Sequence, residues 1–570
     1  MLNSSLLSEE EAQRLCNHFQ SALVSCLQRS LAATIESKLL SRIWQTNTQS
    51  RTGQNHISDQ STADDGHEWT AGEQTVRDVL STISGVPSDR ISRTTTIYQL
   101  GLDSISAVQV AARLRKEGFC VSAADVLERP DTAKLAGFLQ SGEGSSMNVS
   151  SSFDFASFET KYLDSACKEY AISVGSVEAI RPCTSSQGGM LAEFFASEGR
   201  TYLNYQSLKL EGSFDVSTLC RAWETVFRKH PMLRTGFVHV RNSHCPFAMI
   251  TYKASMVERP YVIRKGSTRH SESIMDWRQS IGQEILEGCH RPVWRVLISE
   301  SQESLSMHLV ILHALYDAHS LSIILDDLAA ACRGMPVLSP PAIEPLLGTI
   351  LSSSNGEDSH KQFWERRTAD LQVHRFPNMT PLRTRSFETR TVARECSTLM
   401  SELERRCRHA NVSMQAVGQV AWAQILSAYT GESTVTFGIV LSGRTQEDAE
   451  TIPFPSITTV PFACRTDQSN RTSLSQTLDF NAAVQKHQFT PLSRIQHWLG
   501  HEGEALFDTI FVYQKSSHVT AQSRPWAVVD EEASANVSLN LQLSTDLPNE
   551  DSSLHRSSSS RTRKTNLEYV

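Results

Sequence analysis

The sequence predicts a multidomain protein in which a small helical unit precedes a much larger α/β domain. The chain has 570 residues, which is room for three or four folding units of roughly 150 residues each. Two polar stretches, 45–68 and 141–152, contain few apolar residues and indicate linkers. Beyond residue 177, strand-like apolar runs such as 309–312 and 433–441 alternate with helical stretches, which is typical of an α/β fold.

The composition excludes several classes of protein. Hydrophobic residues make up 39% and charged residues 20%, and the net charge of −8 includes no basic block, so we expect no nucleic-acid partner. The 12 cysteines form no C-x-x-C pair, which argues against a zinc or redox site and favours reduced cytosolic thiols. Residues 1–13 do not resemble a signal peptide, and no apolar run approaches the roughly 18 residues of a membrane span. We expect a cytoplasmic protein without a membrane partner.

Residues 70–141 have the size of a small helical bundle. Apolar spacing predicts a helix over 75–83 that is closed by Gly85. A second helix begins at Ser104, with Asp103 at the position of an N-cap and the Ser104 hydroxyl at the positive end of the helix dipole. By itself this pair of residues is compatible with simple capping.

The string at 100–115 (LGLDSISAVQVAARLR) resembles the carrier domains of nonribosomal peptide synthetases. The resemblance implies a four-helix carrier bundle with 4'-phosphopantetheine attached to Ser104. It also implies that Asp103 helps to orient the metal–coenzyme A complex of a phosphopantetheinyl transferase, which is therefore an expected partner. The surrounding linkers would let a loaded carrier visit more than one other domain.

A second informative segment lies in the large domain, where a buried strand over 307–312 is followed by HALYDA and by a helix over 320–332. A single histidine at the end of a strand can be purely structural. A metal site built from His308, His313 and His319 is disfavoured, because odd spacing puts the first two on opposite faces of the strand. We therefore predict no metal.

This segment resembles the His-His-x-x-x-Asp-Gly motif of condensation domains, with Leu312 in place of the first histidine and Ala318 in place of the glycine. The resemblance implies that His313 is the catalytic histidine and that Asp317 is a structural residue paired with Arg444. Further family motifs follow in the family's order, and one of them includes Arg234 as a supporting residue: 182–187 (PCTSSQ), 228–237 (RKHPMLRTGF), 437–444 (FGIVLSGR), 459–462 (TVPF) and 506–514 (LFDTIFVYQ).

The resemblance implies a two-lobed condensation domain similar to chloramphenicol acetyltransferase, and the strings HALYDAHS and LFDTIFVYQ are most similar to fungal ferrichrome-type siderophore synthetases. The predicted division is a helical remnant of a preceding condensation domain at 1–44, a linker at 45–69, the carrier at 70–141, a second linker at 142–176, a C-terminally truncated condensation domain at 177–535 and a disordered tail at 536–570.

The reaction implied is the attack of an amine on an acyl thioester held on Ser104, either to form a peptide bond or to close a ring. A free α-amine has a pKa near 7.7–8.0, so about a tenth of it is already neutral at pH 7. His313 can then act as a base or mainly position the amine. No adenylation domain is visible, so the acyl group must come from other synthetase domains. Two alternatives stay open: a degenerate, non-catalytic fragment, and a stand-alone acyltransferase of the His-x-x-x-Asp class that uses coenzyme A thioesters.

Overall fold

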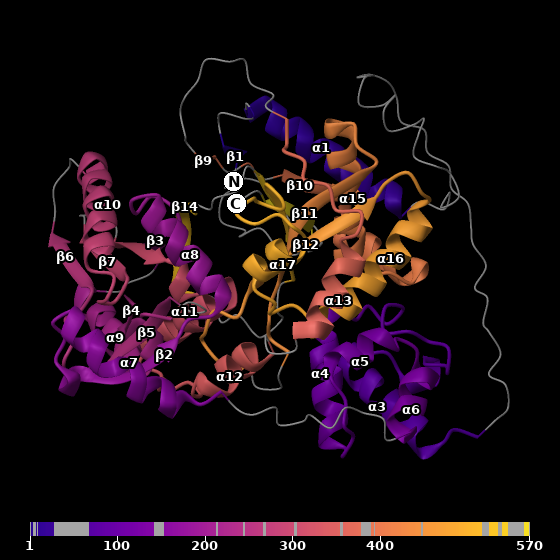
Figure 1. The fold of residues 1–570 in the computed structure, drawn as a ribbon, viewed down its shortest axis with the longest axis horizontal. Helices are drawn as coiled ribbons and strands as arrows, with labels where there is room; N and C mark the ends of the chain where they lie inside the picture. The colour runs from indigo at the N-terminus through magenta and orange to yellow at the C-terminus, as the bar shows by residue number, and fades with distance from the viewer. Residues whose placement is uncertain are drawn as a thin grey trace.

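A computed structural model of the chain shows a helical bundle beside a domain of two lobes (Figure 1). It describes residues 2–3, 7, 9–27, 68–141, 153–544 and 564–568, with gaps at 212–214, 243–245, 266–269, 301–304, 354–356, 378–388, 391, 393, 446–448, 516–523 and 534–538.

The bundle confirms the helices predicted for the small unit. Thr70 and Glu73 form a capping box at the start of the first helix, and Gly85, with a φ of 71°, ends it in the left-handed conformation that glycine adopts without strain. Asp103 is the N-cap of the helix that begins at Ser104, as predicted. The elements are α3 (Ala71–Ser84), η2 (Ser88–Arg90), α4 (Ser104–Lys116), α5 (Ala123–Glu128) and α6 (Thr132–Ser141).

The first lobe holds two mostly antiparallel sheets, and helices pack on the faces of these sheets. A five-stranded sheet has the order β14-β3-β8-β7-β6, and a three-stranded sheet has the order β2-β5-β4. The strands are β2 (Val177–Pro182), β3 (Leu203–Leu210), β4 (Thr235–His239), β5 (Phe247–Tyr252), β6 (Tyr261–Lys265), β7 (Trp294–Glu300), β8 (Leu305–Leu312) and β14 (Trp526–Glu532). The helices are α7 (Phe155–Glu169), α8 (Ser185–Ala196), α9 (Val216–Lys229), α10 (His270–Glu287), α11 (Ala318–Cys332) and α12 (Glu344–Ser352), with the short turns η3 (Val174–Ser176), η4 (Pro231–Arg234) and η5 (His313–Leu315).

The second lobe is built on a sheet with the order β10-β16-β15-β13-β11-β12, to which β1 and β9 are added beside β15. Its strands are β1 (Leu2–Asn3), β9 (Thr389–Arg390), β10 (Arg394–Leu399), β11 (Thr434–Leu441), β12 (Thr458–Arg465), β13 (Thr509–Gln514), β15 (Leu539–Ser544) and β16 (Lys564–Glu568). Its helices are α1 (Glu9–Cys26), α13 (Glu357–Arg367), α14 (Met400–Ala410), α15 (Met414–Thr430), α16 (Asn470–Ala483) and α17 (Leu492–Trp498), with the turns η6 (Ala449–Thr451) and η7 (Val484–Lys486).

Two segments pack against elements that are far from them in the sequence. Strand β14 comes from late in the sequence but pairs antiparallel with β3 of the first lobe, from Trp526 opposite Leu210 to Glu532 opposite Tyr205. Helix α1 comes from the start of the sequence but packs against α15 of the second lobe. Each lobe nevertheless has its own hydrophobic core, one around β8 and the other around α15.

Two of the predicted boundaries are wrong. The linker predicted at 142–176 contains α7, because Phe158 and Tyr162 lie one turn apart and both pack into a core with the three-stranded sheet. The tail predicted to be disordered from residue 536 contains β15 and β16, since the alternating Leu539, Leu541 and Leu543 are fully buried against the sheet. Residues 28–44 of the predicted helical remnant, and most of the linker at 45–69, lie outside the described residues.

Candidate functional site

His313 lies where β8 ends, in the turn η5 that leads to α11. Its backbone N–H donates to the carbonyl of Tyr202 over 2.8 Å, and its ring Nδ1 lies 3.1 Å from the carbonyl oxygen of Tyr316. A carbonyl oxygen can only accept, so Nδ1 carries the proton of that hydrogen bond. The lone pair of the neutral ring is therefore on Nε2.

The surroundings of His313 favour the neutral ring. Burial lowers the pKa of His313, and the Tyr316 carbonyl and the nearby Asp317 carboxylate only partly oppose that effect. The pKa therefore lies below the ordinary value of 6.5. At neutral pH the side chain can accept a proton, which is the property that a general base needs.

Asp317 is buried, and both of its carboxylate oxygens accept hydrogen bonds. The Arg444 guanidinium lies 3.0 Å from Oδ1 and 3.1 Å from Oδ2, and the backbone N–H groups of Ser320 and Ser456 donate to the two oxygens over 2.7 and 3.0 Å. Burial by itself would raise the pKa of Asp317, but Arg444 and these N–H groups outweigh it and hold the pKa below its usual range. The predicted pair of Asp317 and Arg444 is thus present, and groups of the protein itself occupy both oxygens of the carboxylate.

Arg444 also ties down the segment that follows β11. Besides Asp317, its guanidinium donates to the carbonyl oxygens of Ile452 over 3.0 Å and Phe454 over 2.9 Å, and to that of Ala449. One buried cation therefore joins the start of α11 in the first lobe to the chain between β11 and β12 in the second. This arrangement supports a structural role for the pair.

The two departures from the family motif fit the structure without strain. Leu312 is fully buried in the core of the first lobe and pairs with Leu203 across the sheet, so an apolar side chain suits that position. Ala318 is the first residue of α11, directly after the Asp317 N-cap, and it is not among the described residues with a positive φ. A glycine is therefore not required there.

The remaining predicted residues have other surroundings. Arg234 is buried beside the three-stranded sheet, where it donates to Glu178 and to the carbonyl of Tyr252 rather than to the His313 turn. His308 lies 2.9 Å from the Tyr205 hydroxyl, and His319 lies 2.7 Å from the Glu450 carbonyl. Within the described ranges, no group of three or more histidine, cysteine or acidic residues is arranged to hold a metal ion.

Several supporting residues were not predicted from the sequence. The buried Gln187 donates over 2.9 Å to the carbonyl of Ala314, which fixes the His313 turn from α8. Asn204 donates over 2.7 Å to the hydroxyl of Tyr316, whose ring centroid lies 4.9 Å from that of His313. The opening motif at 182–187 was the only signal that pointed to Gln187, and none pointed to Asn204.

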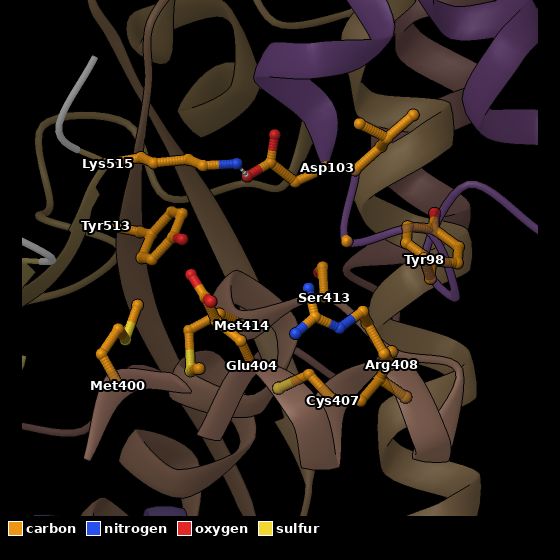
Figure 2. A pocket seen from close by; sticks show the side chains of 13 residues that line it. Tyr98, Asp103, Met400, Glu404, Cys407, Arg408, Ser413, Met414, Tyr513 and Lys515 are labelled. Carbon is orange, nitrogen blue, oxygen red and sulfur yellow. Dashed lines mark hydrogen bonds and ion pairs between the residues drawn. The ribbon is translucent and has the colours of Figure 1, made fainter. Parts of the chain in front are cut away.

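The carrier bundle lies against the second lobe with its attachment motif facing inward. The Ser104 hydroxyl donates over 3.0 Å to the side-chain carbonyl of Gln415, in the first turn of α15. Asp103 uses Oδ1 to cap α4 and Oδ2 to accept from Lys515 over 3.0 Å, as Figure 2 shows. Both residues of the predicted attachment site therefore face the lobe that the carrier touches.

A small cavity of about 80 Å³ lies between the carrier and the second lobe beside Asp103. Lys515 and Arg408 bring positive charge to the cavity, and Asp103 and Glu404 bring negative charge to it. The Tyr513 ring lies beside Lys515 (Figure 2). The full lining is Tyr98, Gly101, Leu102 and Asp103 from the carrier with Met400, Glu404, Cys407, Arg408, Val412, Ser413, Met414, Tyr513 and Lys515 from the lobe.

A second set of contacts holds α5 of the carrier against α16 and η7. Lys486 lies 2.8 Å from Glu128 and 3.6 Å from Asp125. Ala482 of α16 is buried in the hydrophobic core of the carrier. The docked position thus rests on ion pairs and hydrogen bonds around a small apolar contact.

Comparison with known proteins agrees with this geometry. Residues 177–549 match the condensation-domain family model, and residues 74–139 match the phosphopantetheine attachment site model. The chain belongs to the condensation-domain family and carries a phosphopantetheine attachment domain. It is 40% identical over 482 residues to nonribosomal peptide synthetase sidC of Arthroderma benhamiae, covering 84% of this chain and 9% of the relative. It is 28% identical over 444 residues to the hydroxamate-type ferrichrome siderophore peptide synthetase of Schizosaccharomyces pombe, covering 76% of this chain and 9% of that protein.

Solved structures support the two-lobed fold. The condensation domain of monacolin K polyketide synthase MokA superposes with a TM-score of 0.51 at 14% identity, covering 69% of this chain and 92% of that one. The first condensation domain of the calcium-dependent antibiotic synthetase gives 0.51 at 13% identity, covering 69% and 90%. The predicted fold class is confirmed. Among the described helices, none is long and apolar enough to cross a membrane.

Proposed function

We propose that this chain is a carrier–condensation segment of a siderophore-type nonribosomal peptide synthetase, in which an acyl group held on Ser104 is transferred to an amine with the help of His313. The relatives that it matches are peptide synthetases, of which it spans about a tenth of the length. The observation that carries the proposal is the docked carrier, whose Ser104 donates to Gln415 of the condensation domain itself.

The residues around Ser104 fit a phosphopantetheine group. Its hydroxyl stands at the N-terminus of α4, where the helix dipole favours a negatively charged phosphate. Lys515 and Arg408 add two cations beside the cavity. When bound, the group supplies a thiol that carries the acyl chain as a thioester. Ser104 would hold it.

His313 would act on the incoming amine. Its Nδ1–H is held by the Tyr316 carbonyl, so Nε2 would accept the proton that the amine nitrogen loses as it attacks the acyl carbon. The C–S bond of the thioester would break as the C–N bond forms, and the imidazolium would return the proton to the departing sulfur. The lowered pKa keeps the ring neutral and ready to accept. Asp317 would not touch substrate, because Arg444 and two backbone N–H groups already use its oxygens.

Two experiments test the proposal in sequence. The purified chain is first incubated with coenzyme A and a broad phosphopantetheinyl transferase, and its intact mass is recorded. We expect one phosphopantetheine addition, which is absent in Ser104→Ala. The loaded chain is then given an acyl thioester and an amine acceptor, and we expect amide product from the wild type at a rate at least about a hundredfold above His313→Ala.

The matched variant is Asp317→Asn. Removing one charge from a buried ion pair costs about 3–5 kcal/mol, so this variant should lose stability as well as turnover, whereas His313→Ala should melt like the wild type. Equal turnover in His313→Ala and the wild type would contradict the catalytic role. A folded chain that loads but forms no product would instead favour the non-catalytic alternative, and turnover with free acyl-coenzyme A in Ser104→Ala would favour the stand-alone acyltransferase.

The partners and location follow from the same proposal. A phosphopantetheinyl transferase would load Ser104, and other synthetase domains would supply the acyl group and the acceptor. Such an enzyme would work in the cytoplasm. The domain limits proposed on this basis are a carrier over 70–141 and a condensation domain whose main segment begins with α7 and continues through β15.

A further inference from the structure

Helix α15 is buried on every side and therefore has a covering element on each of them. Every residue from Met414 to Leu426 is buried. One side meets the sheet, where a Cβ on Gly418 would lie 2.6 Å from the Phe511 ring. Another side meets α16, to which Gln419 and Asn481 are joined by hydrogen bonds of 3.1 and 2.7 Å.

The remaining side of α15, which includes Trp422, is covered by α1 from the far end of the sequence. The Phe19 ring packs edge-on against Trp422 and also meets Phe511, with centroids 6.5 Å apart in each case. Trp422 is fully buried. Without α1, the large ring of Trp422 would face solvent, so the second lobe is complete only with this helix in place.

Helix α1 in turn depends on the lobe. Its apolar residues recur every three or four positions along one face, and none is more than 1% exposed: Ala12, Leu15, Cys16, Phe19, Ala22, Leu23 and Cys26. A single helix of 18 residues gains little stability in water without a surface to pack on. The helix and the lobe therefore stabilise each other.

Polar contacts fix the position of α1 on the lobe. His18 Nδ1 lies 3.2 Å from the hydroxyl of Tyr429, near the end of α15. Arg394 of β10 donates over 3.1 Å to Gln13. The strand β1, which precedes α1, pairs antiparallel with β15 and β9. Specific contacts at two elements, together with the strand pairing, distinguish this arrangement from loose apolar packing.

We infer that α1 is an integral part of the condensation domain, and that the carrier is inserted between α1 and the rest of that domain. The carrier is joined to α1 through residues 28–67 and to α7 through residues 142–152, and both helices are packed on the same two-lobed domain. This replaces the interpretation of α1 as the remnant of a neighbouring domain.

Attachment at both ends limits how far the carrier can travel. The 11 residues at 142–152 span at most about 40 Å even when fully extended, and the second attachment returns the carrier to the same domain. A short tether gives an effective concentration in the millimolar range. Among condensation domains, the carrier therefore delivers to this one, a conclusion about partner choice that rests on the proposed function.

Native thiols test the position of α1 without any need for catalysis. Cys16 and Cys26 of α1 are buried, and burial raises the pKa of Cys26 to about 12, whereas Cys120 of the carrier is exposed. In the full chain treated with iodoacetamide, mass spectrometry should find Cys16 and Cys26 modified about tenfold or more slowly than Cys120. In Phe19→Asp this protection should be lost, while Asn17→Asp, on the exposed face, should keep it.

A cut chain provides the second measurement. A protease site is placed within 28–67 of the full chain, and the cleaved protein is passed through a gel-filtration column. We expect the α1 fragment to elute with the remainder as a complex of one chain's mass. Release of the fragment, or labelling of Cys16 and Cys26 as fast as Cys120 in the wild type, would overturn the inference. A dimer in which α1 of each chain packs on the other chain would overturn the inference that the carrier is attached at both ends to one condensation domain. Phosphopantetheine loading of Ser104, measured on the same samples, reports separately on the proposed function.

Discussion

Helix α1 and the carrier are held on the second lobe in opposite chemical ways. Helix α1 is held by a row of buried apolar side chains centred on Phe19 and Trp422. The carrier is held by hydrogen bonds and ion pairs around a cavity, with Ser104 on Gln415 and Lys515 on Asp103. Apolar burial gives a lasting contact, whereas exposed and half-exposed ion pairs contribute little and release easily. The difference indicates which segment is fixed and which one moves.

The largest expected effect tests the fixed segment. Phe19→Ala removes a fully buried ring between α1 and α15, which should cost about 3–5 kcal/mol of stability in the second lobe. Hydrogen exchange of the α15 amides measures this loss as a lower free energy of opening. Asn17→Ala, on the exposed face of α1, should leave it unchanged. A loss below about 1 kcal/mol in Phe19→Ala would place α1 in the same class of contact as the carrier.

Reversing a charge at the contact between the condensation domain and the carrier should have the next largest effect. Lys486→Glu places like charges opposite Glu128 and Asp125, so it should reduce transfer from the loaded carrier by about five- to tenfold without altering the stability of α15. The double variant Lys486→Glu with Glu128→Lys should recover much of the loss. Turnover of an acyl group on the chain's own carrier gives the measurement, and a double variant no better than the single one would argue against this pairing.

Ionic strength should separate the two contacts in the wild-type protein. Raising salt from 0.1 to 1 M shortens the screening length from about 10 to about 3 Å, which weakens the ion pairs of Lys486 and Lys515. Transfer should fall by a few-fold, and the protection of Cys26 from alkylation should not fall. Salt sensitivity of both readouts would remove the distinction.

The smallest effect is expected from acid. Burial, together with the nearby His360 and Lys486, lowers the pKa of His487 to about 4. As the pH falls, His487 takes up a proton near pH 6.5 in the unfolded state but only near pH 4 in the folded state. The contribution of His487 to the free energy of unfolding is therefore fully present above pH 6.5 and declines as the pH falls from 6.5 to about 4. Thermal melting between pH 7 and 4 measures the decline, which should be shallower in His487→Gln. An unchanged slope would show that other groups set the acid response.

The sequence predicts the local parts of this molecule better than its long-range contacts. The helix that ends at Gly85, the N-cap at Asp103 and the strand that ends before His313 follow from local spacing and capping, and the structure has them. The pair of Asp317 and Arg444 was predicted only through the family motif.

The misplaced elements share one physical cause. Helix α7 and strands β15 and β16 lie in segments rich in polar residues, where a few apolar side chains such as Phe158 or Leu541 are enough once a partner surface exists. The contact of Phe19 with Trp422 joins residues about 400 positions apart, and no local pattern encodes it. Gln415 and Lys515 were missed for the same reason, since each acts only on a second folded unit.

The two oxygens of Asp103 set a condition for attaching phosphopantetheine to the carrier. One oxygen caps α4, and the other is taken by Lys515 while the carrier is docked, at the same time as the Ser104 hydroxyl is held by Gln415. A docked carrier therefore offers neither group to a third protein. The transferase can therefore attach phosphopantetheine only to a carrier that has left this position, with Lys515 released from Asp103 and Ser104 released from Gln415.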